Sequence, residues 1–178
     1  MSLAKLKQMK KSIVVIVFSI FFLNQMQSQE TAKSILDKAY NKAKIENKNV
    51  FVLFKASWCG WCKKMEANMN QPATKKLFTD NFVVVHLDVQ EREDKKQLEN
   101  PGATELLATY KGDKSGIPFF LIFDAYGKLL ADSFDDKGQN LGCPASVEEV
   151  AVFKKKLKDT STLSDEELEI IAAVFQKK

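Results

Sequence analysis

Cysteine and histidine are scarce in this sequence, which has three cysteines and one histidine among 178 residues. Small secreted domains that depend on a disulfide framework have a higher density of cysteine, usually in even numbers. A zinc ribbon would need a second C-x-x-C pair, and the further soft ligands here are only His86 and Cys143. A four-ligand zinc site made by Cys59, Cys62, His86 and Cys143 stays open as a formal alternative.

The sequence also lacks a hydrophobic run long enough to cross a bilayer as a helix, which takes about 20 residues. The run over residues 13–23 is shorter, with one hydroxyl among apolar side chains. It follows four lysines and no acid, and Ser28 beyond it is a small residue suited to cleavage. This pattern predicts a secretory signal peptide over residues 1–28, with an uncleaved N-terminal anchor as the alternative. In both cases we expect residues 29–178 to fold outside the cytoplasm.

Net charge of one sign is missing once the predicted signal peptide is set aside. The formal net charge of the whole chain is +4, and residues 1–28 contribute four lysines and no acid, so the remainder is formally neutral. A neutral domain without a basic cluster has no electrostatic footprint for nucleic acid, so we expect no nucleic-acid partner. The remaining part, about 150 residues, is long enough to bury a core without disulfides.

Hydrophobic patterning predicts short buried strands that alternate with helices. Helices are predicted over residues 31–47, 63–69, 74–78 and 103–110, and strands over residues 50–54, 82–89, 119–123 and 128–132. Ser-x-x-Glu capping boxes at Ser146 and Ser164 open two more helices. The charged segment 90–101 is interpreted as a solvated segment or an exposed helix. The long stretch between Asp88 and Pro118 is interpreted as a solvated decoration, with a partner-recognition insert as the alternative. We expect one α/β domain over residues 29–178, with a central mixed sheet, helices on both faces and an extra C-terminal helix.

The segment Trp58-Cys59-Gly60-Trp61-Cys62 follows a predicted buried strand directly and opens a predicted helix. Two residues between the cysteines bring their sulfurs within bonding reach. Cys59 then lies near free backbone N–H groups and the positive end of the helix dipole, which favour its thiolate. Cys62 is one turn inside the helix, where it is shielded and can attack a mixed disulfide formed by Cys59. The pattern predicts disulfide exchange, with no cofactor beyond the Cys59–Cys62 disulfide.

Two stretches resemble signatures of the thioredoxin superfamily, VFVLFKASWCGWCKKM at residues 50–65 and SGIPFFLIF at residues 115–123. The resemblance covers roughly residues 31–158. The WCGWCKK form is most similar to exported thioredoxin-like proteins related to the periplasmic thioredoxin-like domain of the disulfide transporter DsbD. The resemblance implies a thioredoxin-like fold and a periplasmic or secreted protein of a Gram-negative bacterium. It also implies a cis bond between Ile117 and Pro118 that faces the dithiol, with an ordinary trans proline as the alternative.

The sequence departs from thioredoxin at residues that support the dithiol. Leu53 stands in place of thioredoxin's buried acid and Val84 in place of the lysine that partners it, so that ion pair becomes apolar. Glu66 lies four residues after Cys62 on the same helical face, and it is the candidate to assist proton transfer from Cys62. An exposed glutamate on a charged helix is an equal alternative. Trp61 stands where thioredoxin has proline.

Several residues around the dithiol have two interpretations. Trp58, Gly60 and Trp61 are expected to flank the sulfurs, and Trp58 is expected to touch substrate. Cys143 is interpreted as a small, partly buried free thiol, with a third redox-active cysteine or an intermolecular site as alternatives. His86 alternates within an apolar strand and is interpreted as structural.

The sequence predicts an exported thiol–disulfide oxidoreductase that acts on protein thiols and disulfides. The resemblance favours the reducing or isomerising direction, and a membrane electron-transfer protein is one candidate partner. We expect a monomer. The first alternative is a thioredoxin-fold binding or adaptor module whose dithiol is not catalytic. The second is metal delivery through the C-x-x-C motif.

Overall fold

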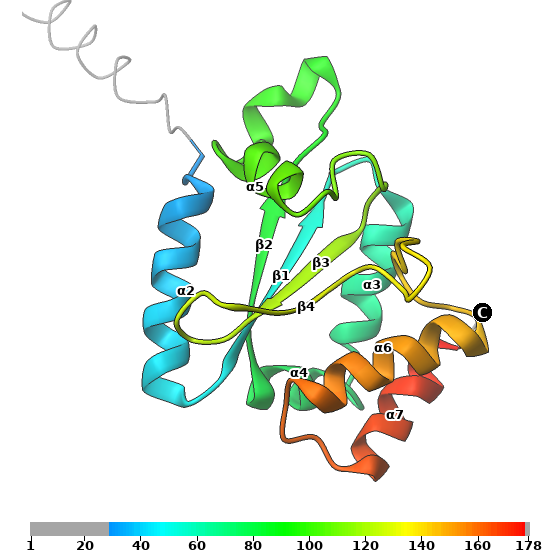
Figure 1. Cartoon of the computed structure of the whole chain (residues 1–178). Coiled ribbons are helices and arrows are strands. Elements are labelled where there is room, and N and C mark those ends of the chain that lie inside the picture. The colour runs from blue at the N-terminus through cyan, green and yellow to red at the C-terminus, as the bar shows by residue number, and fades with distance from the viewer. Residues whose placement is uncertain (1–28, 177–178) are drawn as a thin grey trace, which may run out of the picture.

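The computed structural model describes residues 29–176, so the predicted signal peptide over residues 1–28 lies outside the described residues. The elements follow one another as α2 (Ala32–Glu46), β1 (Asn49–Lys55), α3 (Gly60–Met69), α4 (Lys75–Asn81), β2 (Phe82–Asp88), the 3-10 helix η1 (Glu93–Leu98), α5 (Ala103–Thr109), β3 (Phe119–Phe123), β4 (Leu129–Asp132), α6 (Val147–Asp159) and α7 (Asp165–Phe175) (Figure 1). This order confirms the predicted alternation of strands and helices.

The four strands form one mixed sheet in the order β2-β1-β3-β4. β1 pairs with β2 in parallel and with β3 antiparallel, and β3 pairs antiparallel with β4. The parallel register places Lys55, the last residue of β1, opposite Asp88, the last residue of β2. Both strands therefore deliver their C-terminal ends to the same edge of the sheet, where the C-x-x-C motif begins.

β1 separates two hydrophobic layers because successive side chains of a strand point to opposite faces. Phe51 and Leu53 pack in the layer that contains residues of α3, α4, α6 and α7. Val52 and Phe54 pack in the layer that contains residues of α2 and α5. In Figure 1, α2 accordingly lies on one side of the sheet and α6 and α7 on the other. The prediction of helices on both faces is confirmed.

The extra C-terminal helix, α7, completes the first of these layers. The ring centroid of Phe175 lies 5.1 Å from that of Phe153 and 6.4 Å from that of Phe78. Both predicted capping boxes are present. At the start of α7 the Ser164 hydroxyl accepts the Glu167 amide, and the Glu167 carboxylate accepts the Ser164 amide at 2.9 Å. The helix is thus fixed at its first residue by capping and at its last by aromatic packing.

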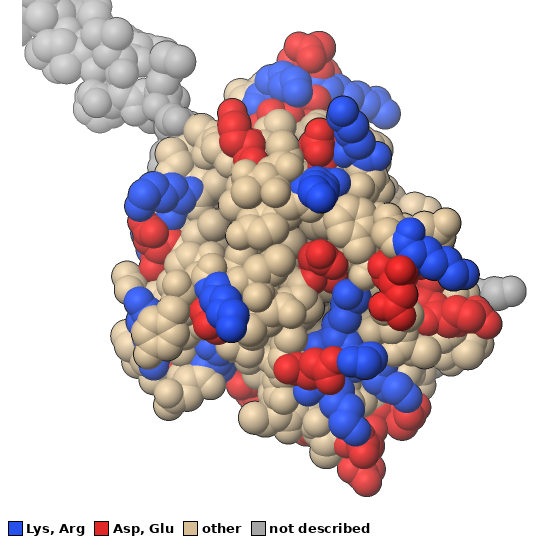
Figure 2. All heavy atoms as spheres, viewed as in Figure 1, with Lys and Arg blue, Asp and Glu red and all other residues tan. Residues whose placement is uncertain are grey.

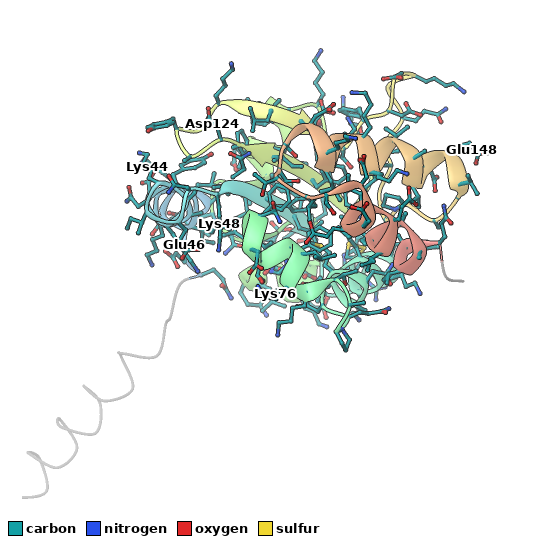
Figure 3. The ribbon with its side chains drawn as sticks, turned by 90° about the horizontal axis from the view of Figure 1, so that it is seen from below. Lys44, Glu46, Lys48, Lys76, Asp124 and Glu148 are labelled. Atoms are coloured by element: carbon teal, nitrogen blue, oxygen red, sulfur yellow. A yellow bond between two sulfur atoms is a disulfide. The ribbon has the colours of Figure 1, made fainter. Side chains whose placement is uncertain are left out.

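Lys48 fixes the turn that leads from α2 into β1. Its ammonium donates to the Glu46 carboxylate at 2.7 Å and to the Thr79 carbonyl of α4 at 2.8 Å. Figure 3 shows Glu46 and Lys48 close together at this end of α2. Asn47 between them adopts a left-handed conformation with φ of 53° and ends the helix. These contacts fix the turn at which β1 starts.

Charges of both signs are interspersed on the surface. Figure 2 shows lysine, arginine, aspartate and glutamate side chains mixed over the visible face, without a separate patch of either sign. Several form ion pairs such as Lys154 with Glu169 at 2.6 Å. Such exposed pairs contribute at most about 1 kcal/mol each to the free energy of unfolding. Within residues 29–176, no helix combines the length and the apolar character needed to cross a membrane.

The prediction of a solvated segment or exposed helix over residues 90–101 is confirmed for η1 and is wrong for the two ends of the segment. η1 itself is exposed, but Glu91 and Asn100 at the two ends of the segment are 4% and 6% exposed. The Asn100 side chain donates to the Glu30 carbonyl at 2.9 Å and accepts the Asp88 amide at 2.7 Å. Charge density in the sequence does not reveal this burial, because the partners come from other parts of the chain.

Candidate active site

The two cysteines of the C-x-x-C motif form a disulfide at the start of α3. Cys59 is the N-cap residue of the helix and Cys62 lies in its first turn, with 5.3 Å between their Cα atoms. The Cys59 amide donates to the Ala56 carbonyl at 3.1 Å and closes the turn between β1 and α3. The side chains are 3% and 1% exposed. The predicted placement of the motif, after a buried strand and at a helix N-terminus, is confirmed.

The environment of Cys59 favours a negative charge on its sulfur. The Cys62 amide donates to Cys59 Sγ at 3.0 Å, and the positive end of the α3 dipole points at the same atom. In the reduced protein these groups stabilise a thiolate, which is the nucleophilic form of cysteine. The arrangement can therefore support attack by Cys59 on another disulfide.

The cis-proline loop faces the dithiol. The Ile117–Pro118 bond is cis, so the trans alternative is wrong, and the Ile117 carbonyl oxygen lies 3.6 Å from Cys59 Sγ. The Asn140 side-chain nitrogen lies 2.9 Å from the Gly116 carbonyl oxygen and 3.1 Å from that of Pro118. Asn140 thus holds the loop from both sides of the cis bond. The sequence analysis missed this residue, because it lies more than 20 positions away in a polar loop.

Each cysteine of the motif is preceded by a tryptophan that is open to solvent. Trp58 is 45% exposed, and its indole N–H donates to the Gln90 carbonyl at 2.8 Å. Trp61 is 60% exposed, and no atom lies within 4 Å of the position that a Cβ on Gly60 would occupy. The exposure of Trp58 excludes a purely core role, while its position beside the dithiol and its contact with substrate stay predictions.

Cys143 is a buried free thiol near the active site. Its side chain is 8% exposed, and burial raises its pKa to about 11. It lines a groove of about 790 Å³ together with Gly60, Trp61 and Phe175. A thiol with this pKa stays protonated at neutral pH and is a poor nucleophile. The interpretation as a small, partly buried free thiol is confirmed.

Glu66 belongs to a half-buried ionic cluster. Its carboxylate lies 2.8 Å from Lys55 Nζ and 3.4 Å from His86 Nε2, and its side chain is 25% exposed. The alternative of an exposed glutamate is therefore wrong. Burial lowers the pKa of His86, and the neighbouring Glu66 carboxylate opposes that shift. His86 is thus held in place by an acid rather than by apolar packing alone.

The acid–lysine pair of this site differs from the pair that thioredoxin buries. Leu53 is fully buried and Val84 packs against the same core, so the expected apolar replacement is confirmed. Lys55 and Glu66 form a different pair, at the end of β1 and on α3. The sequence analysis named Glu66 but missed Lys55, because only the crossing of strand and helix brings the two together.

A small polar pocket lies behind the active-site loop. It has a volume of about 180 Å³, and its lining includes Lys55, Lys63, Glu66, Asp88 and Glu91. Burial raises the pKa of Asp88, and the Glu91 and Glu66 carboxylates act in the same direction against Lys55. The sequence analysis missed Asp88 and Glu91. Both lie near the end of an apolar strand, where a charged residue is ordinarily solvated.

The structure does not assemble the four-ligand zinc site considered above. Cys59 and Cys62 are bonded to each other, and His86 contacts Glu66 on another part of α3. Within residues 29–176, no group of three or more histidine, cysteine, aspartate or glutamate side chains is placed to hold a metal ion.

The family of this chain follows from its match to a thioredoxin-like family model over residues 31–125, just over half of its length. The chain belongs to this thioredoxin-like family. It is a thioredoxin-fold protein with a disulfide-forming cysteine pair.

Similar solved structures include a disulphide isomerase from Xylella fastidiosa Temecula1. It has 19% identity and a TM-score of 0.49, and the match covers 85% of this chain and 93% of that one. The C-terminal domain of DsbD from Neisseria meningitidis in the oxidised form has 24% identity and a TM-score of 0.42, covering 58% and 84%. An uncharacterized protein of Caenorhabditis elegans is 40% identical over 62 residues, which are 34% of this chain and 8% of that protein.

Proposed function

We propose that the protein is an exported thiol–disulfide oxidoreductase that exchanges disulfides with protein substrates through Cys59 and Cys62. The observation that carries this proposal is the Cys59–Cys62 disulfide at the start of α3, with the Cys62 amide 3.0 Å from Cys59 Sγ. A site of this kind can cycle between a dithiol with an activated thiolate and a disulfide.

In the reducing direction, the Cys59 thiolate attacks a substrate disulfide. A Cys59–substrate bond forms, the substrate S–S bond breaks, and the leaving sulfur takes a proton. Cys62 then loses its proton and attacks Cys59, which forms the Cys59–Cys62 disulfide and releases the second substrate thiol. Two electrons pass from the dithiol to the substrate. The isomerising direction uses the first step and its reversal on another substrate sulfur.

The surrounding residues have distinct roles in this scheme. The Ile117 carbonyl and Pro118 border the approach to Cys59, and they support an extended substrate segment beside it. Trp58 and Trp61 offer exposed aromatic surface on the substrate side. Glu66, one turn beyond Cys62 on α3, receives the Cys62 proton through solvent.

Direction, partner and location are parts of the same proposal. The resemblance to the thioredoxin-like domain of DsbD supports the reducing or isomerising direction, with a membrane electron-transfer protein restoring the dithiol. Residues 1–28 direct export, to the periplasm of a Gram-negative bacterium or beyond it. The protein acts as a monomer. The alternative, a binding module with a non-catalytic dithiol, gives no reason for an activated Cys59.

A trapping experiment tests the exchange reaction and export together. The full chain with Cys62→Ala is expected to accumulate mixed disulfides with proteins in an extracytoplasmic fraction, because nothing resolves the Cys59–substrate bond. The double variant Cys59→Ala/Cys62→Ala is the control and should give none. The proposal fails if the single variant traps nothing and the wild type neither reduces nor oxidises a model disulfide protein.

A redox titration of the wild-type dithiol against glutathione decides the direction. Related proteins range from about −270 mV for thioredoxin, a reductant, to about −120 mV for a strong oxidant. A value near the first figure supports the proposed direction, and one near the second overturns it.

A further inference from the structure

The segment that follows β2 is hydrogen-bonded to the loop that leads to the dithiol. The Ser57 amide donates to Glu91 Oε1 at 2.5 Å, and the Ser57 hydroxyl donates to Glu91 Oε2 at 2.8 Å. The Trp58 indole N–H donates to the Gln90 carbonyl. Two successive residues before Cys59 are thus bonded to two successive residues after β2.

The backbone of Gln90 explains why Glu91 can reach this loop. Gln90 has φ of 53°, in the left-handed region, which redirects the chain just beyond the parallel pairing of β1 and β2. The Gln90 side chain donates to the Asp113 carbonyl at 3.0 Å, and the Glu91 amide donates to the Glu99 carboxylate at 2.7 Å. The Gln90 side chain and the Glu91 amide are therefore both hydrogen-bonded, which fixes the backbone from which the Glu91 side chain reaches Ser57.

The Glu91 carboxylate is buried and bonds to Ser57, two residues before the proposed nucleophile. It is 4% exposed, and a charge at such a position is costly unless hydrogen bonds or opposite charges compensate it. Ser57 supplies two donors. Lys55 of β1, Lys63 and Glu66 of α3, and Asp88 of β2 line the same pocket. Buried charges of this kind next to a reactive group are common at functional sites.

We propose that Glu91 is a positioning residue of the dithiol, one that fixes the loop before Cys59 and, through its charge, sets the balance between dithiol and disulfide. This inference rests on the proposed function. The Glu91 carboxylate is bonded to Ser57, which lies two residues before Cys59 in the chain. A negative charge near a thiol in the protein interior disfavours its thiolate. Glu91 therefore stabilises the disulfide relative to the dithiol and makes the dithiol a better reductant.

Equilibration with glutathione measures this effect. The dithiol and oxidised glutathione give the Cys59–Cys62 disulfide and two reduced glutathiones, with transfer of two electrons. Glu91→Gln keeps the size of the side chain and one acceptor for Ser57 but removes the charge. We expect this variant to shift the equilibrium about threefold to tenfold towards the dithiol, or ~15–30 mV. The pH profile of Cys59 alkylation should move to lower pH. Glu93→Gln, an exposed change on η1, is the matched control and should shift neither.

The outcomes separate this inference from the proposed function. A wild type that exchanges with neither glutathione nor a protein disulfide contradicts the proposed function itself. A wild type that exchanges normally, with Glu91→Gln indistinguishable from Glu93→Gln in equilibrium and pH profile, makes Glu91 merely structural and overturns the inference, even if stability falls. Should Glu91→Gln not fold, Ser57→Ala replaces it. Loss of the donating hydroxyl strengthens the field of the carboxylate and should shift the equilibrium about twofold towards the disulfide; no shift again overturns the inference.

Discussion

The groups that contact the Cys59 sulfur are backbone groups rather than a side-chain base. The Cys62 amide and the α3 dipole act on its sulfur from one side, and the Ile117 carbonyl borders it on the other. Side chains contribute at longer range, through the Lys55–Glu66 pair. The donors nearest the Cys59 sulfur are thus supplied by the local fold itself, and the Glu91 charge proposed above would act in addition to them.

Asn68 is a buried polar residue whose replacement is predicted to change the stability of the protein. Its side chain is 1% exposed on α3, and neither its nitrogen nor its oxygen has a hydrogen-bond partner among the described residues. An unpaired buried amide costs about 1–3 kcal/mol. We expect Asn68→Leu, which has a similar shape, to raise the free energy of unfolding in urea by about 1 kcal/mol. Asn68→Ala is the comparison for size and should lower stability by leaving a cavity. Equal losses in both variants would contradict the prediction.

At the scale of elements, the site is built where a strand stops and a helix starts. β1 is central in the sheet and buried at both faces, so its C-terminal end is fixed, and α3 begins within a few residues of it. The cis-proline loop comes from the start of β3, which neighbours β1. The neighbouring strands β1 and β3 therefore bring the C-x-x-C motif and the cis-proline loop to one edge of the sheet, although these two segments are more than 50 residues apart in the chain.

The cap of α7 gives a prediction for this scale. Ser164→Ala removes the hydroxyl that accepts the Glu167 amide, and loss of such a cap costs about 1 kcal/mol. Because Phe175 of α7 packs in the main core, the loss should appear in global unfolding rather than in local fraying. Urea denaturation followed by tryptophan fluorescence measures it. Ser146→Ala, at the matching box of α6, should cost a similar amount, and no loss in either variant would show that the caps are replaced by water.

For the whole molecule, the neutral side chains of the buried Cys143 and the half-buried Tyr40 predict a loss of stability in alkali. Burial raises the pKa of Cys143 to about 11. The pKa of Tyr40 is raised to about 12, mainly by burial and to a smaller extent by the nearby Tyr110 and Asp124. The unfolded chain releases these protons at lower pH than the folded chain does. Their stabilising contribution is therefore complete below about pH 8.5 and is lost as the pH rises towards 11 and 12.

The free energy of unfolding, measured in urea between pH 8 and pH 11, tests this expectation. The decline should be shallower in Cys143→Ala and in Tyr40→Phe than in the wild type, after each is referred to its own value at pH 8. Parallel curves for all three proteins would show that other groups cause the alkaline loss.

The sequence by itself determined those features that depend on neighbours within a few positions. The order of strands and helices, the capping boxes, the C-x-x-C motif at a helix start and the proline signature at Pro118 all follow from local patterns. Each of them needs only the residues next to it in the chain, so periodicity and spacing are enough to locate them.

Only the tertiary structure decided which partners the charged side chains near the active-site loop have. Glu66 meets Lys55 across 11 positions, and Glu91 meets Ser57 across 34. Helical spacing pointed to Glu66 in the sequence, but Lys55 and Glu91 look there like ordinary solvated charges. Their burial and pairing depend on the register of β1 against β2 and on the path of the chain after Asp88. The reason is physical: the cost of burying a charge is offset by partners that only the folded chain brings within hydrogen-bond distance.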